Sequence, residues 1–222
     1  MARGSRGSSA GEKLRFAIPK GALFAESIAA LKAAGVDVGG LADPGRQLVI
    51  VTPGFDFIIG KPSDIPVYVA SGAADVGISG KDVLAELDLD VVEMVDLGFG
   101  ACRFVVAEPE DAHASIEEQY AHLGVIRVAT KYPRVTEAYF AERGVQIEIV
   151  KLNGNIEIAP LIGIADQVVD ITQTGTTLRE TKLKLGADVM ESTARFIANP
   201  VALRTRAAQV TALADGLARG SV

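Results

Sequence analysis

The chain has 222 residues, of which 49% are hydrophobic and 23% charged, and its formal net charge at pH 7 is −6. This balance is typical of a globular protein and excludes disorder as the dominant state. No apolar run approaches the roughly 20 residues that a membrane helix needs, which disfavours a membrane as a partner, and the acidic balance disfavours nucleic acid.

Residues 1–12 are rich in Gly, Ser and Arg, and no apolar segment separates them from the first expected strand. A signal peptide would carry such a segment. We therefore interpret 1–12 as a disordered tail and expect the protein to be cytoplasmic.

From residue 13 onward, short aliphatic runs alternate with segments of helical periodicity. The pattern predicts strands at 14–18, 47–52, 74–79, 91–95, 103–107, 126–130, 146–150, 167–172 and 189–197. It predicts helices at 22–34, 63–71, from 80 onward, 132–144, 155–164, 175–184, from 200 onward and 207–216. Strands separated by helical segments are typical of crossover connections and mostly parallel sheets.

These strands are too many for one sheet in a chain of this length. We therefore expect an α/β protein of two lobes, with mostly parallel sheets and flanking helices. Lobe I is expected to comprise 13–100, and the chain is expected to return to it at 187–215. Lobe II is expected to comprise 101–186.

Cys102 is the sole cysteine, and His113 and His122 are the only histidines. One thiol cannot form an intrachain disulfide, and this inventory disfavours both a zinc site and a Ser-His-Asp triad. Any catalysis is therefore expected to rest on carboxylates, lysines, arginines, backbone amides or a cofactor.

The segment 169–178 reads as an aliphatic strand, a turn and then a helix. Asp170 lies near the carboxyl end of that strand, where ligands of open α/β sheets bind. The turn consists of Thr174, Gly175, Thr176 and Thr177. Its hydroxyls and backbone N–H groups suit a phosphate monoester. A Thr174 that only caps the helix, with Gly175 relieving strain, explains the same residues without a ligand.

Two further turns combine glycine with lysine at the expected ends of strands. They are Pro19-Lys20-Gly21 and Ser79-Gly80-Lys81-Asp82. In a parallel sheet both turns lie at one edge, where their lysines can meet a polyphosphate, although either lysine alone is more often a solvated surface charge. Asp82 after Gly80-Lys81 departs from the P-loop pattern, which disfavours a P-loop kinase or ATPase.

Glu157 lies about one turn inside the helix predicted at 155–164. A carboxylate at that position either caps the helix and faces its dipole, or points toward a ligand and binds hydroxyls or a metal-bound water. Position alone favours the capping role.

Several separate motifs follow one another along the chain. They are Phe16-Ala17-Ile18-Pro19-Lys20-Gly21, Lys61-Pro62-Ser63-Asp64-Ile65-Pro66, Ala74-Asp75-Val76-Gly77-Ile78-Ser79-Gly80-Lys81-Asp82, Ala129-Thr130-Lys131-Tyr132-Pro133, Lys151-Leu152-Asn153-Gly154 and Phe196-Ile197-Ala198-Asn199-Pro200. A further signature runs through Glu157, Gly163, Ala165, Val168, Asp170, Ile171, Thr174, Gly175, Thr177 and Leu178. Together they resemble the ATP phosphoribosyltransferase family over most of the chain.

The resemblance implies a two-lobed fold like that of periplasmic binding proteins. It implies transfer of 5-phosphoribose from phosphoribosyl pyrophosphate to N1 of ATP, with release of pyrophosphate, as the first step of histidine biosynthesis. It also implies Mg²⁺, held mainly by oxygens of the ligands.

Site residues are carried over from the family's motifs by position. Asp170 would bind the ribose diol, Thr174 to Thr177 the 5-phosphate, and Glu157 would lie near the ribose. Lys20, Gly21, Lys61, Gly80, Lys81 and Asp82 would line the nucleotide and pyrophosphate side of the cleft. An oxocarbenium-like transition state needs positioning and charge stabilisation but no protein nucleophile, so Asp170 and Glu157 are the catalytic candidates.

Two features bear on function within this resemblance. Ala22 stands where many family members carry an arginine. The chain ends about 20 residues after Asn199-Pro200, as in the short form of the family. The short form implies a homodimer that joins a regulatory subunit resembling histidyl-tRNA synthetase in a hetero-octamer.

Two other interpretations remain at this point. A two-lobed solute-binding module without catalysis has the same expected fold, although secretion would then be expected. A purine or pyrimidine salvage transferase also has an aspartate-containing Thr-Gly phosphate loop, but in a smaller single lobe, and the other motifs disfavour it.

Overall fold

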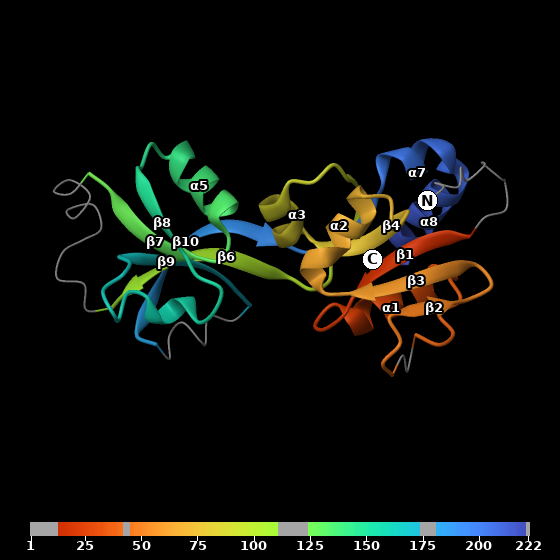
Figure 1. Ribbon diagram of the computed structural model, residues 1–222, viewed down its shortest axis with the longest axis horizontal. Helices are drawn as coiled ribbons and strands as arrows, with labels where there is room; N and C mark the ends of the chain where they lie inside the picture. The colour runs from red at the N-terminus through yellow and green to blue at the C-terminus, as the bar shows by residue number, and fades with distance from the viewer. Residues whose placement is uncertain (1–12, 42–44, 111–123, 174–180, 221–222) are drawn as a thin grey trace, which may run out of the picture. The chain divides into compact units, whose positions relative to one another are not determined.

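The computed structural model describes residues 13–41, 45–110, 124–173 and 181–220. The chain forms two compact units, each built from more than one segment (Figure 1). Unit 1 comprises Met1–Ser79, Leu89–Leu97 and Arg195–Val222, and unit 2 comprises Gly80–Asp88 and Gly98–Ala194. The expected tail, 1–12, lies outside the described residues.

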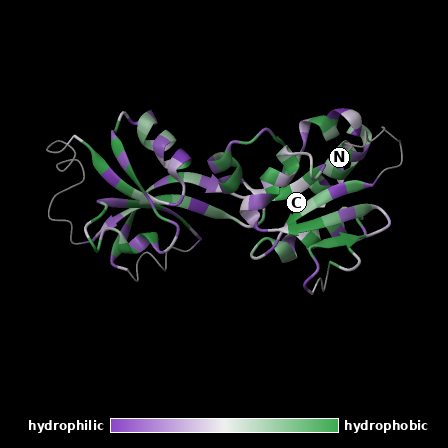
Figure 2. Cartoon of the chain, in the orientation of Figure 1, coloured by the Kyte–Doolittle hydropathy of each residue, from purple (hydrophilic) through white to green (hydrophobic). Residues whose placement is uncertain are grey.

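A mixed six-stranded sheet, sheet A, forms the centre of unit 1. In spatial order its strands are β2 (Val49–Val51), β3 (Phe55–Gly60), β1 (Leu14–Pro19), β4 (Val76–Gly80), β11 (Ala194–Ala198) and β5 (Val92–Asp96). β1 runs parallel to β3 and β4, whereas β2 pairs antiparallel with β3, and β5 with β11. Figure 2 shows hydrophobic residues along much of β3, as expected for a strand in the interior of the sheet.

Helices cover sheet A. They are α1 (Phe24–Ala33), α2 (Ile65–Ala70) after the 3-10 turn η1 (Pro62–Asp64), α7 (Pro200–Thr205) and α8 (Ala207–Gly220). α1 and α8 pack against each other, and small residues let them come close. A Cβ added to Gly216 of α8 would lie only 3.3 Å from the Cβ of Ala34, which follows α1. Asn199 begins α7, and its side chain accepts hydrogen bonds from the backbone N–H groups of Val201 and Ala202.

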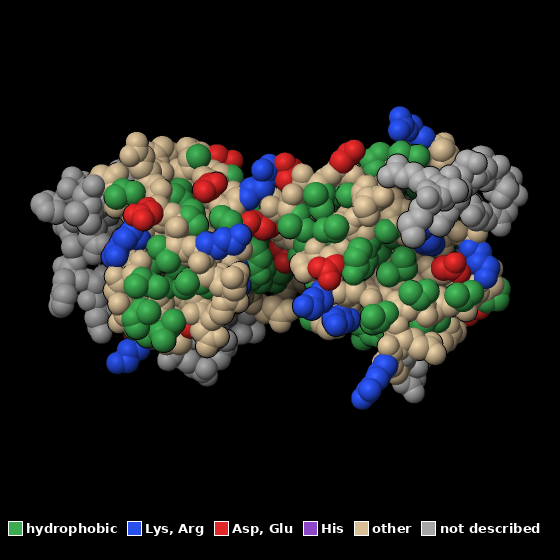
Figure 3. All heavy atoms as spheres, in the orientation of Figure 1, with side chains coloured by type: hydrophobic (Ala, Val, Ile, Leu, Met, Phe, Trp, Pro, Cys, Tyr) green, Lys and Arg blue, Asp and Glu red, His purple; other side chains and the backbone are tan. Residues whose placement is uncertain are grey.

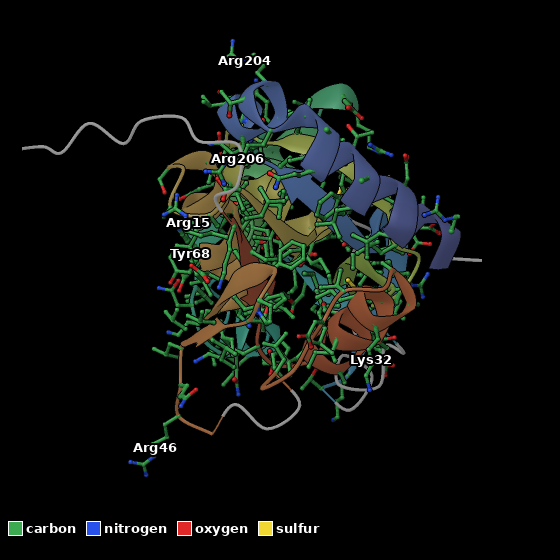
Figure 4. All side chains as sticks on the ribbon, turned by 90° about the vertical axis from the view of Figure 1, so that its right-hand side faces the viewer. Arg15, Lys32, Arg46, Tyr68, Arg204 and Arg206 are labelled. Atoms are coloured by element: carbon green, nitrogen blue, oxygen red, sulfur yellow. The ribbon has the colours of Figure 1, made fainter. Side chains whose placement is uncertain are left out.

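The buried carboxylate of Asp75 links distant segments of unit 1. Its Oδ2 accepts hydrogen bonds from the backbone N–H of Arg15 at 2.7 Å and from Nη1 of Arg206 at 3.0 Å. Figure 4 shows Arg15 and Arg206 close together in this unit. Arg15 belongs to β1 and Arg206 lies between α7 and α8, so this one carboxylate ties the first strand to the C-terminal helices.

Unit 2 contains a mixed five-stranded sheet, sheet B. In spatial order its strands are β10 (Leu183–Ser192), β6 (Cys102–Pro109), β9 (Gln167–Thr172), β7 (Ile126–Thr130) and β8 (Ile147–Lys151). β7, β8 and β9 are parallel, whereas β6 is antiparallel to β9 and β10. The helical elements of the unit are α3 (Lys81–Leu87), α5 (Pro133–Glu142) and the 3-10 turn η2 (Ile156–Ile158).

Sheet B has an apolar core on each face. α5 contributes Val135, Tyr139 and Phe140 to one core, and the segment around η2 contributes Ile156 and Ala159 to the other. Alternate residues of β6 enter opposite cores, because successive strand side chains point to opposite faces. This sandwich fixes the edge of the sheet at which β7, β8 and β9 end.

The expected α/β class with flanking helices is confirmed, but both sheets are mixed rather than mostly parallel. The strand β3 was not predicted. The helix expected at 155–164 is wrong, because only the short turn η2 forms there. The strand expected at 189–197 is two strands, β10 and β11, and Leu183 and Lys184 belong to β10 rather than to a helix. No helix within the described ranges is long and apolar enough to cross a membrane.

Candidate active site

The carboxyl ends of β7, β8 and β9 gather polar residues at one edge of sheet B. Thr130, the last residue of β7, is in register with Lys151 of β8 and Val169 of β9. Lys131 and Asp170 therefore follow paired positions on neighbouring strands. Glu157 lies in η2, which contacts both β7 and β9. Unit 2 thus brings the predicted residues Asp170 and Glu157 to the same edge.

The carboxyl group of Asp170 is partly buried at this edge. Burial raises its pKa above the ordinary value, and the charge of Glu157 acts in the same direction. The backbone N–H of Ile171, 2.8 Å from Oδ1, and the charge of Lys131 act against the rise. A desolvated carboxylate is a strong hydrogen-bond acceptor, so Asp170 suits a polyhydroxylated ligand.

Tyr132 lies close to two of the predicted carboxylates. Burial raises the pKa of its hydroxyl, and the negative charges of Asp170 and Asp82 raise it further. The ring packs edge to face on Phe104, with centroids 4.8 Å apart. The phenol is therefore held as a neutral group beside Asp170 and Asp82.

The turn at the start of α3 is fixed by side-chain contacts. Ser192 Oγ accepts a hydrogen bond from the backbone N–H of Asp82 and donates to its Oδ1, both at 2.9 Å. The N–H of Lys81 donates to the carbonyl of Thr193 at 3.0 Å. A Cβ on Gly80 would collide with Oδ1 of Asp82, so a side chain at position 80 would displace this carboxylate from its hydrogen bond with Ser192. Gly80, Lys81 and Asp82 thus form a rigid turn anchored to the end of β10.

Unit 1 brings Lys20, Gly21 and Lys61 together. Pro19 and Gly60 are paired in the β1–β3 register, and the N–H of Lys20 donates to the carbonyl of Gly60 at 2.8 Å. The two lysines therefore follow neighbouring strand ends, and both are exposed. Gly21 has φ +87°, a left-handed conformation that favours glycine.

The turn Thr174, Gly175, Thr176 and Thr177 lies outside the described residues. In the part of the chain that the structure describes, no group of three or more His, Cys, Asp or Glu side chains is arranged to hold a metal ion. On the face shown in Figure 3, acidic and basic side chains are interspersed, so anion binding depends on local geometry rather than on one broad basic field.

Comparison with known proteins identifies the family of this chain. A sequence model of ATP phosphoribosyltransferase matches residues 61–219. The chain belongs to the ATP phosphoribosyltransferase family. Among its relatives, the ATP phosphoribosyltransferase of Rubrobacter xylanophilus is 48% identical over 206 residues, which cover 93% of this chain and 95% of the relative. That of Moorella thermoacetica is 49% identical over 214 residues, which cover 94% and 93%.

Solved structures agree with the family assignment. The ATP phosphoribosyl transferase (HisG:HisZ) complex from Thermotoga maritima contains a chain that is 30% identical, with a TM-score of 0.78 and coverage of 94% of this chain and 98% of that one. A histidine kinase sensor domain with similarity to periplasmic binding proteins has a TM-score of 0.55 at 15% identity, with coverage of 93% and 89%. This second likeness concerns the fold alone, and it agrees with the expected two-lobed class.

Within this ATP phosphoribosyltransferase fold, sequence reasoning assigned no role to Lys131 or Tyr132. Both belong to the family motif at 129–133, and both come directly after the correctly predicted strand 126–130. Their place beside Asp170 follows from the parallel pairing of β7 with β9. Had the sequence analysis placed these two predicted strands side by side, it would have brought Lys131 and Tyr132 to Asp170.

Proposed function

We propose that this chain transfers the 5-phosphoribosyl group of phosphoribosyl pyrophosphate to N1 of ATP, giving N1-(5-phosphoribosyl)-ATP and pyrophosphate in the first step of L-histidine biosynthesis. Family membership across most of the chain supports the reaction. The observation that carries the assignment of the site is the partly buried Asp170 at the carboxyl end of β9, with Glu157 and Lys131 beside it.

The pentose substrate is proposed to bind unit 2. Asp170 accepts hydrogen bonds from the ribose hydroxyls, Glu157 lies near the ribose, and Thr174, Gly175, Thr176 and Thr177 bind the 5-phosphate. As N1 of ATP forms its bond to C1 and the bond to pyrophosphate breaks, positive charge develops on the ribose ring. Nearby carboxylates stabilise that charge, so the chemistry needs no protein nucleophile.

ATP and the leaving pyrophosphate are proposed to contact Lys20, Gly21, Lys61, Gly80, Lys81 and Asp82. The exposed lysines Lys20 and Lys61 supply positive charge from two adjoining strand ends. Mg²⁺ would neutralise the pyrophosphate and be held mainly by ligand oxygens, with Asp170 or Glu157 as carboxylate partners from the chain.

The chain is proposed to act in the cytoplasm as a homodimer that joins a regulatory subunit resembling histidyl-tRNA synthetase in a hetero-octamer. The support is the likeness to a chain of the HisG:HisZ complex from Thermotoga maritima. Ala22 stands where many family members carry an arginine, so this chain supplies no cation from that position.

The first test is an activity assay. The purified chain is incubated with ATP, phosphoribosyl pyrophosphate, Mg²⁺ and a pyrophosphatase, with and without the regulatory subunit, and the absorbance of N1-(5-phosphoribosyl)-ATP is followed. Product from ATP, and none from free purine or pyrimidine bases, is expected. Tight binding of a small solute without product under either condition would instead support the solute-binding alternative.

Variants test the proposed site directly. Asp170→Ala and Thr174→Ala are each expected to lower kcat/KM by roughly 100-fold, because each removes a polar contact that stabilises the bound or reacting substrate. Steady-state kinetics of the same complex measure the effect. Glu137→Ala, an exposed change on α5, is the control and should leave kcat/KM unchanged.

A further inference from the structure

Lys131 is an exposed lysine that the reaction, as described so far, does not use. It follows β7 directly, and β7 is the immediate neighbour of β9, which carries Asp170. Within the described ranges Lys131 makes no hydrogen bond or ion pair, although its charge acts on the Asp170 carboxyl. Its ammonium group is therefore available to a ligand at that edge.

The backbone on both sides of Lys131 is held by two fully buried threonines. Thr130 Oγ1 donates to the carbonyl of Val169 at 2.8 Å and accepts from the N–H of Tyr132 at 2.9 Å. Thr136 Oγ1 donates to the carbonyl of Tyr132 at 2.7 Å. Val169 directly precedes Asp170, so these bonds hold Lys131 and Asp170 in fixed register. A cation on such a scaffold loses little backbone entropy when it binds.

The charge of this edge calls for a cation. Asp170 and Glu157 are both carboxylates, and a pentose carrying a phosphate and a pyrophosphate is strongly anionic. Repulsion between them must be offset locally. Lys151 ends β8, which lies one strand farther from β9, whereas Lys131 follows the strand next to it. Position therefore selects Lys131 rather than Lys151.

We propose that Lys131 is a substrate-binding residue that contacts a phosphate group of phosphoribosyl pyrophosphate and, through its charge, determines the affinity for that substrate rather than for ATP. The inference rests on the proposed function, because it names a further residue of the same site. In the empty site Lys131 balances the charge of Asp170, and in the filled site it donates to phosphate oxygens.

The test uses the chain in complex with its regulatory subunit. Lys131→Ala is compared with Lys131→Arg and with Lys32→Ala, which removes the same charge from an exposed position on α1. Lys131→Ala is expected to raise KM for phosphoribosyl pyrophosphate about tenfold, the loss typical of one charge-assisted hydrogen bond, and to leave KM for ATP nearly unchanged. Lys131→Arg should recover most of the affinity, and Lys32→Ala should behave as the wild type.

Calorimetric titration with phosphoribosyl pyrophosphate alone separates this inference from the proposed function. The dissociation constant should rise about tenfold in Lys131→Ala even if the wild type yields no product. If the wild type forms product but Lys131→Ala binds the pentose substrate as tightly as before, the inference on Lys131 fails and the function stands. Equal weakening toward both substrates, or no binding by the wild type, would also overturn the inference.

Discussion

Arg127 and Asp166 form a pair at the amino ends of β7 and β9, the edge of sheet B opposite Lys131 and Asp170. The backbone N–H of Arg127 donates to Asp166 Oδ2 at 2.8 Å, and its Nη2 donates to Oδ1 at 2.7 Å. Nη1 also donates to the carbonyl of Gly163 at 3.0 Å. The pair thus fastens the segment after η2 to the parallel strands that carry the candidate site.

This pair makes part of the stability depend on pH. Burial alone would raise the pKa of the Asp166 carboxyl, but the hydrogen bonds and charge of Arg127 hold it below the ordinary value. A carboxyl whose pKa is lower in the folded state stabilises the fold at pH values above the unfolded pKa, near 3.9. That stabilisation is lost as the pH falls through the lower, folded pKa.

Asp166→Asn is expected to lower the free energy of unfolding by about 1 kcal/mol at pH 7, since the Arg127 side chain is 40% exposed and solvent weakens the pair. The difference from the wild type should shrink below about pH 4. Urea unfolding between pH 7 and pH 3 measures both effects. Asp188→Asn, in an exposed pair with Arg103, is the control with a smaller expected change. A difference that stays constant with pH would contradict this account.

Among the secondary-structure elements, β3 shows where the sequence pattern was misinterpreted. The sequence predicts one strand at 47–52, whereas the following Pro53-Gly54 is the turn of a hairpin in which Val51 pairs with Asp56. The Thr52 hydroxyl accepts a hydrogen bond from the N–H of Phe55 and closes that turn. Turn residues mark the end of a strand, but they do not show whether the next segment forms an antiparallel hairpin with that strand or leads elsewhere.

The error at 155–164 has a different physical cause. The apolar residues there have helical spacing, but Pro160 has no N–H and Gly163 adopts φ +76°. The 3-10 turn η2 therefore ends at Ile158. Ile156 and Ala159 still pack into the core, but from a turn rather than from a helix. By contrast 126–130 and 167–172 were predicted with correct bounds, because each is a short run rich in β-branched residues with turn residues beyond it.

The packing of α2 on sheet A depends on Gly77. An added Cβ would lie 2.8 Å from the carbonyl oxygen of Ala17 and 3.1 Å from Cγ2 of both Ile65 and Val69. Gly77→Ala is therefore expected to lower the free energy of unfolding by about 1–3 kcal/mol, because β1 or α2 must move. Gly54→Ala is the control, since its Cβ would meet nothing within 4 Å. Urea unfolding of both variants gives the comparison, and equal stabilities would contradict the packing argument.

At the scale of the whole molecule, the candidate site depends on contacts between distant parts of the sequence. Lys20 and Lys61 adjoin only because β1 pairs with β3, the strand that was not predicted. Asp82 and Asp170 both act on Tyr132, although they lie far from it in sequence. Local motifs therefore identified the residue types and strand ends, whereas the groups that adjoin one another follow from the order of strands in each sheet.

The interleaved segments make unit 1 dependent on the C-terminal helices. Val210 and Leu217 of α8 are fully buried, and α8 packs against α1 and β5. Arg206 supplies one of the bonds to Asp75. The two cores of sheet B, in contrast, are formed entirely by residues of unit 2. Loss of α7 and α8 should therefore affect the two units unequally.

Deletion of residues 200–222 is expected to remove amide-exchange protection from β1, β3 and β5, while β6, β7 and β9 keep theirs. The deletion exposes the apolar surface that α8 covers. The free energy lost with that burial exceeds the marginal stability of a small unit. Hydrogen exchange read by mass spectrometry locates the loss. Leu217→Ala is the graded version and should weaken unit 1 by about 2–5 kcal/mol, because it opens a cavity in a fully buried position. Equal loss of protection in both sheets would show instead that the two units unfold as one.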